Sequence, residues 1–145
     1  MTTTDAILSI LESMASGSDP MLKTVLYESA FGGNVRLDRK PTPSAIVYLL
    51  QSWRLDTERG LKHREVDAEV FFCERADLNA KGDAIKGVMD SLEPIVDEFV
   101  SLLLSEPSFE VSEIRATAAY GKFDTNVCGY SLQFTAVERQ GTCYK

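Results

Sequence analysis

The amino-acid sequence predicts an α+β fold in a single domain over residues 1–145. The domain is expected to contain one antiparallel sheet of four to five strands, and a mixed sheet that also includes parallel pairs is the alternative. A short N-terminal helix and one long amphipathic helix are expected to pack on one face of the sheet. Three observations lead to this prediction. The 145 residues suit one domain, two segments carry apolar residues at helical spacing, and several others alternate apolar with polar residues as half-buried strands do.

The first helix is predicted over residues 4–15. Its apolar residues recur at positions i, i+3, i+4 and i+7, and they are Ile7, Ile10, Leu11 and Met14. Thr3 or Thr4 is expected to cap the first turn. Gly17 and Pro20 follow, and they indicate that the helix has ended.

The long helix is predicted over residues 77–104 and has one apolar and one charged side. Its apolar stripe consists of Ile85, Val88, Met89, Leu92, Val96, Phe99 and Leu103. The opposite side carries Asp83, Lys86, Asp90, Glu93, Asp97 and Ser101. Pro94 removes one backbone hydrogen bond, so it predicts a kink near residues 90–91 unless it begins a second helix.

Strands are predicted by alternation and by β-branched or aromatic runs. The expected strands are at Val25–Leu26–Tyr27, at Val35 and Leu37, over 46–55, over 66–73, and in a terminal hairpin of 111–120 and 129–138. Pro41 and Pro43 cannot lie in a central strand. The charged residues 56–65 are expected to form a protruding loop, and residues 121–128 the hairpin connection.

The charge pattern excludes some classes of protein. There are 22 acidic and 15 basic residues, for a net charge of −7, which disfavours tight binding along the phosphate backbone of DNA. No apolar run approaches the ~20 residues of a membrane span, and no secretory signal is visible at the start. We therefore expect a globular protein that binds no membrane.

No catalytic, cofactor or metal site is predicted. Cys73, Cys128 and Cys143 have neither zinc-site nor disulfide-framework spacing, so they indicate free thiols in a reducing compartment. His63 is expected to be a solvated loop residue, although a Cys128–His63 dyad stays open. Carboxylates at Asp90, Glu93 and Asp97 could hold a divalent cation, but a solvated helix face is the preferred interpretation. Residues 31–34 lack the pattern of a phosphate-binding loop.

Two features indicate a partner. Residues 54–64 hold a local basic cluster that either docks on an acidic partner or phosphate or is simply solvated. The hairpin has a long tip and aromatic residues, and strand edges near it could pair with another chain. The candidate oligomer interface is Arg59, Lys62, Arg64, Phe123, Asp124, Asn126 and Tyr130.

The order of elements resembles that of the tail-terminator, tail-completion and neck-ring (head–tail joining) proteins of tailed bacteriophages. The likeness rests on the short N-terminal helix, the Gly33-Asn34 turn, the long helix after a polar loop, and three sequence stretches: Ala45-Ile46-Val47-Tyr48-Leu49, Ala68-Glu69-Val70-Phe71-Phe72 and residues 123–135. Its motifs are structural and include no catalytic residue.

The resemblance implies a non-catalytic virion protein, assembled in the host bacterial cytoplasm. It would form a six-fold or twelve-fold ring of copies of itself, contact neighbouring neck or tail proteins and let DNA pass without specific binding. The candidate lumen residues are Asp83, Asp90, Glu93 and Asp97. The alternatives are a small-ligand or protein-binding module of a bacterial cell and an enzyme that uses Cys128 or His63.

Overall fold

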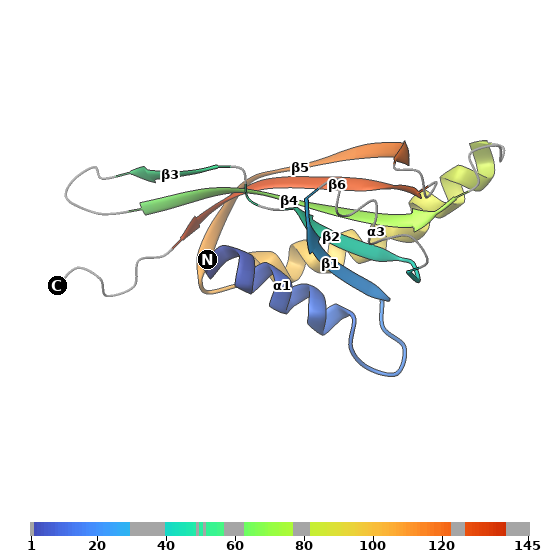
Figure 1. Ribbon diagram of the computed structural model, residues 1–145, viewed down its shortest axis with the longest axis horizontal. Coiled ribbons are helices and arrows are strands. Elements are labelled where there is room, and N and C mark those ends of the chain that lie inside the picture. Colours follow the sequence, from blue (N-terminus) through green and yellow to red (C-terminus); the bar gives the residue numbers. More distant parts are fainter. Residues whose placement is uncertain are drawn as a thin grey trace.

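The computed structural model describes residues 2–29, 40–48, 50, 52–56, 63–76, 82–122 and 127–138. The elements in chain order are α1 (Thr2–Met14), β1 (Thr24–Glu28), β2 (Ser44–Tyr48), β3 (Trp53–Asp56), β4 (His63–Arg75), α3 (Gly82–Leu104), β5 (Phe109–Lys122) and β6 (Val127–Glu138). Both helices lie on the same side of one sheet (Figure 1). The predicted α+β class is therefore confirmed.

The sheet has six strands and is mixed. Its order is β1-β2-β4-β6-β5, and β3 pairs with β4 beside this path. β1 and β2 are parallel, and the other pairs are antiparallel. The expected four to five strands and mainly antiparallel pairing match this sheet only roughly, because local alternation does not reveal the direction in which β1 meets β2.

The strand predicted over residues 46–55 is in fact two strands. Val47 of β2 pairs with Val70, and Trp53 of β3 pairs with Val66. The chain from Val47 to Trp53 is therefore two residues longer than the stretch of β4 opposite it, so the pairing breaks between β2 and β3. All of β2 is buried, whereas Trp53 and Leu55 of β3 are exposed, so the expected burial on both faces holds for β2 only.

The main core lies between the sheet and the two helices. α1 contributes the predicted Ile7, Ile10, Leu11 and Met14, and α3 buries Met89, Leu92, Ile95, Phe99 and Leu103. The ring of Phe99 lies 5.2 Å from that of Phe72 on β4 and 6.3 Å from that of Phe134 on β6. These tilted aromatic contacts fix the position of α3 over the centre of the sheet.

The long helix is a single α-helix from Gly82 to Leu104 with Pro94 inside it. The alternative in which Pro94 starts a second helix is therefore wrong. The predicted start at residue 77 falls on residues outside those described. No helix in the described ranges combines the length and hydropathy needed to cross a bilayer.

The other face of the sheet has a smaller apolar cluster, formed by Leu26, Ile46, Tyr48, Phe71, Cys73 and Val127. Burial is the main cause that raises the pKa of the Tyr48 hydroxyl above its ordinary range. The rest of this face carries polar side chains, as the alternation in β4 and β6 predicts.

The terminal hairpin is confirmed and longer than predicted. β5 and β6 pair Ala118 with Tyr130, with irregular register between Ser112 and Arg115 and between Ala119 and Lys122. Glu113 has a positive φ of 53° at the first of these, which identifies a bulge in the last strand of the sheet. The predicted strand at Val35 and Leu37 lies outside the described residues.

Both ends of the loop predicted over residues 56–65 belong to strands, and residues 57–62 lie outside the described residues. β3 extends to Asp56, and β4 already begins at His63, where the two residues pair. Together, β3 and residues 63–66 of β4 form an extension that we call the arm. Figure 1 shows the arm reaching beyond both helices. Charged side chains suggested a loop here, but Arg64, Glu65 and Val66 of β4 pair with β6 as well as with β3, so these charged residues belong to the sheet.

Candidate interaction surfaces

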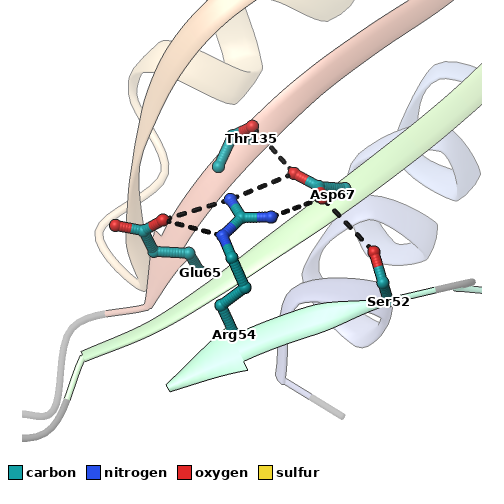
Figure 2. Close-up of polar contacts among 5 residues, drawn as sticks. All are labelled: Ser52, Arg54, Glu65, Asp67 and Thr135. Carbon is teal, nitrogen blue, oxygen red and sulfur yellow. Dashed lines mark hydrogen bonds and ion pairs between the residues drawn. The ribbon is translucent and has the colours of Figure 1, made fainter. Parts of the chain in front are cut away.

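The arm is fastened to the sheet by a polar network around Arg54 (Figure 2). The Arg54 guanidinium binds Asp67 Oδ2 at 2.7 Å and Glu65 Oε2 at 3.1 Å. Asp67 also accepts hydrogen bonds from Thr135 Oγ1 at 3.0 Å and from Ser52 Oγ at 3.3 Å. The network joins β3, β4 and β6, so it sets the register of a strand that has only four residues.

The hydrogen-bonded ion pair of Arg54 and Asp67 shifts the pKa of both groups. The hydrogen bond from Arg54 is the main cause that lowers the pKa of Asp67, and the bond to Asp67 is the main cause that raises the pKa of Arg54. Both side chains are exposed, so solvent screens the pair and its effect on global stability is small. Its consequence is local: it holds the arm in one position.

The opposite face of the arm presents apolar and cationic groups. Trp53 pairs with Val66 and Leu55 with Arg64, so their side chains share the helix-side face of the sheet. Trp53 is 47% exposed and Leu55 is 46% exposed. The Arg64 guanidinium lies 4.6 Å from the centre of the Trp53 ring, a cation–π contact that orients both groups. Trp and Arg are the residue types that most often dominate protein interfaces.

Arg64 of the arm is linked to the first turn of α1 through Glu138. This side chain is buried, and its Oε2 accepts hydrogen bonds from the Thr3 N–H at 3.0 Å and the Thr3 hydroxyl at 2.6 Å. Its Oε1 lies 3.5 Å from the Arg64 guanidinium. A carboxylate at this position is favoured by the positive end of the helix dipole. A distant glutamate thus supplies the acceptor that the sequence analysis assigned to Thr3 or Thr4.

A second surface lies where α3 borders the hairpin. A depression of about 370 Å³ is lined by Glu93, Val96, Asp97, Ala116 and Tyr130, and we call it the α3–β5 depression. Burial first, and then the nearby Glu93 carboxylate, raise the pKa of the Tyr130 hydroxyl. The site combines two carboxylates with an aromatic ring and two aliphatic side chains, which suits an apolar group that carries or adjoins a positive charge.

The depression continues along the exposed strand β5. Every residue from 112 to 118 is exposed. Ala116 pairs with Leu132 and Ala118 with Tyr130, so both alanines belong to the helix-side face. Tyr120 follows at 63% exposed. β5 is the last strand in the sheet order, and α3 leaves this strip of it uncovered.

The predicted site residues divide into three groups. Arg59, Lys62, Phe123, Asp124 and Asn126 lie outside the described residues. Arg64 is on the arm, whereas Tyr130 lies in the α3–β5 depression. Because Arg64 pairs with Glu138, eight residues along β6 from Tyr130, the two positions are about 26 Å apart.

The predicted lumen residues share a helix and its exposed side. Asp83, Asp90, Glu93 and Asp97 are all exposed on α3. Lys86 Nζ lies 2.7 Å from Asp90 Oδ2, so one of the four carboxylates is paired within the helix. Glu93 and Asp97 also line the α3–β5 depression.

The residues considered for catalysis do not come together. His63 begins strand β4 and is not in a loop, and Cys128 pairs with Glu74 at the other end of that strand. Glu74 is eleven positions along the strand from His63, which corresponds to about 36 Å, so a Cys128–His63 dyad within one chain is excluded. Cys73 and Cys128 are buried free thiols, and Cys143 lies outside the described residues. In the described ranges, no three His, Cys, Asp or Glu side chains are grouped so that they could hold a metal ion.

The sequence analysis missed Trp53, Leu55 and Glu138 as site residues. Trp53 and Leu55 belonged to an apolar run that suggested a buried strand, and only the position of the helices shows that they are exposed. Glu138 is separated from Thr3 by 135 residues, and no local pattern signals such a contact. Comparison with known proteins adds no assignment: no family model matches the chain, and no curated protein matches it.

Proposed function

We propose that this chain is a non-catalytic structural subunit of a tailed-phage virion. Copies of it would form a six-fold or twelve-fold ring at the head–tail neck or at the tail end, next to other neck or tail proteins, and DNA would pass through the ring. The observation that carries the proposal is the presence of two unlike exposed surfaces far apart on one domain, the arm and the α3–β5 depression. Subunits that join through unlike surfaces form head-to-tail contacts, and such contacts close into rings when the rotation between subunits permits.

The charge of the chain supports the passage of DNA. The net charge is −7, and the exposed side of α3 carries Asp83, Asp90, Glu93 and Asp97. A channel lined by carboxylates repels phosphates and does not displace their counterions. We assign this side of α3 to the lumen.

The α3–β5 depression favours a second candidate function, a protein- or ligand-binding module of a bacterial cell. Its volume of about 370 Å³ is within the range of small-molecule sites. It is an open depression beside an edge strand, however, and its apolar strip continues along β5, which suits a protein surface better than a small molecule.

Light scattering after size-exclusion chromatography tests the proposal. The expected result is a species that contains six or twelve copies of the 16.1 kDa chain, either alone or in complex with added purified phage neck and tail proteins. A strict monomer under both conditions would refute it. A metabolite retained through native purification, detected by mass spectrometry on a monomeric chain, would favour the second candidate.

A further inference from the structure

We propose that β1 of one copy pairs with β5 of the next copy, as antiparallel strands in a register that sets Tyr27 opposite Ala116. This inference rests on the proposed assembly and specifies its interface. It commits to one occupant for the exposed edge of β5, a second copy of this chain, because the directions, lengths and faces of the two strands match. The junction uses the strand that borders the α3–β5 depression and leaves the arm for contacts with neck or tail proteins.

The directions of the two strands match because they are at opposite ends of the sheet. In the order β1-β2-β4-β6-β5, no further strand lies beside either of them in the part of the chain that the structure describes. β1 is parallel to β2, and three antiparallel pairings separate β2 from β5, so β5 runs opposite to β1. When a second copy lies beside the first in the same orientation, β5 therefore meets β1 of that copy as an antiparallel strand. Such pairing continues the sheet from one copy into the next.

The lengths of the two strands select one register. β1 has five residues, Thr24–Glu28. The exposed part of β5 has one stretch of continuous pairing with β6, the five residues 115–119, and an irregularity lies on either side of it. Bulges bend an edge away from regular pairing, so this stretch is where another strand fits. Matching five residues with five sets Tyr27 opposite Ala116.

The faces of the sheet agree with this register. Val25 packs against the main core and Leu26 belongs to the smaller cluster on the other face, so Tyr27 lies on the helix side. Ala116 is on the helix side too, and a shift by one residue would put the two on opposite faces. Tyr27 is 43% exposed and Ala116 is exposed, so a large ring would cover a small residue. A second β5 would offer only alanines on this face.

The charges on the other face of the sheet support the same register. It sets Glu28 opposite Arg115, and strand alternation puts both on the face away from the helices. Arg115 is exposed and Glu28 is half-buried. A cross-strand pair of opposite charges adds about 0.2–1 kcal/mol. The backbone pairing thus supplies the contact, and the charges favour this register over others.

The register also suits a ring. Along the sheet, Tyr27 pairs with Val47, Val47 with Val70, Val70 with Leu132, and Leu132 with Ala116. The two junction residues therefore lie in one row, and each copy is added sideways with no displacement along the strands. A head-to-tail contact without such a displacement closes into a ring around an axis parallel to the strands, whereas a repeated displacement gives a helical filament. All copies keep α3 on the same side of the joined sheet, as its assignment to the lumen requires.

Chemical cross-linking between two co-expressed variants tests the register. One chain carries Tyr27→Cys and a second, larger tagged chain carries Ala116→Cys, both with Cys143→Ser, since the other two cysteines are buried. The short bis-thiol reagent dibromobimane is expected to join the two chains into a heterodimer. As the matched control, Thr117→Cys replaces Ala116→Cys, because Thr117 is equally an exposed residue of β5 but points to the other face of the sheet.

The outcomes separate the inference from the proposed function. A cross-linked heterodimer from the first pair and not from the control supports the inference. Assemblies that form without this cross-link, or that cross-link equally through Thr117, overturn the register and leave ring formation standing. A cross-link between two Ala116→Cys chains would mean that β5 pairs with itself, which overturns the inference as well. A chain that remains monomeric and gives no cross-link overturns both the inference and the proposed function.

Charge reversal adds an energetic test. Arg115→Glu should raise the dissociation constant between subunits about tenfold, because it sets two carboxylates opposite each other. Adding Glu28→Arg to the same chain restores a pair of opposite charges, so the dissociation constant should return to within about threefold of its original value. A double variant that binds no better than Arg115→Glu alone would contradict the inference. Circular dichroism checks that each variant is folded.

Discussion

Replacement of Phe99 by alanine tests how α3 is held on the sheet. Phe99 is fully buried, with its ring 5.2 Å from Phe72 and 6.3 Å from Phe134. Truncation removes the apolar surface that meets two strands and leaves a cavity between helix and sheet. Such changes cost about 3–5 kcal/mol, a large part of the ~5–15 kcal/mol by which domains are stable. We expect Phe99→Ala to lower the free energy of unfolding by about 3–5 kcal/mol.

Urea denaturation, followed by circular dichroism at one fixed protein concentration, measures this loss. The fixed concentration matters because assembly contributes to the apparent stability. Leu104→Ala is the matched control, since Leu104 is on the same helix but is 63% exposed, and it should cost less than about 0.5 kcal/mol. A loss below about 1 kcal/mol for Phe99→Ala would mean that α3 does not pack on the sheet as described.

Three further predictions concern the strands and the arm. Gly129→Ala should lower the free energy of unfolding, measured by urea denaturation, by about 3 kcal/mol, because the added Cβ would lie 1.8 Å from a backbone carbonyl oxygen of β4. The control is Gly87→Ala on α3, whose Cβ would meet nothing within 4 Å, so that this change should be neutral or stabilising. Glu138→Gln should lower the free energy of unfolding by about 1–2 kcal/mol. It should also raise amide hydrogen exchange in the first turn of α1 more than in α3, and an equal increase in both helices would contradict the capping role of Glu138. Arg54 lowers the pKa of Asp67 in the folded chain, so the charged carboxylate holds the arm in place at pH values above about 4, the pKa of an unfolded aspartate. The arm is released as the pH falls through the lower pKa of the folded state. NMR protection factors of β3 should therefore decrease in acid, and Asp67→Asn should give low protection at every pH.

The sequence predicted those elements whose apolar pattern is continuous. Ile7, Leu11 and Met14 identify α1 by their spacing, and α3 buries much of the stripe that the sequence indicates, including Leu92 and Phe99. Each pattern works because one side of the element meets a single continuous core.

The pairing of strands was harder to predict. The break between Tyr48 and Trp53 depends on β4 being two residues shorter than the chain opposite it. The parallel pairing of β1 with β2 depends on the path between them. Both are properties of contacts between distant segments, and neither leaves a periodic trace in the sequence.

The candidate surfaces were predicted only in part. Asp90, Glu93 and Asp97 were identified correctly as one exposed face, because helical geometry places them there. The exposure of Trp53 could not be predicted, since it arises because the sheet extends further than the helices that cover it. The contact of Glu138 with Thr3 joins the two ends of the described chain, and only the folded structure reveals it.

Counting subunits by native mass spectrometry is the most direct measurement of the central claim, that this chain works by joining copies of itself through unlike surfaces. The account predicts one closed species with a defined number of 16.1 kDa chains, and electron micrographs of the same sample should show rings. A spectrum that contains only single chains, at every concentration and with neck and tail proteins present, would contradict it.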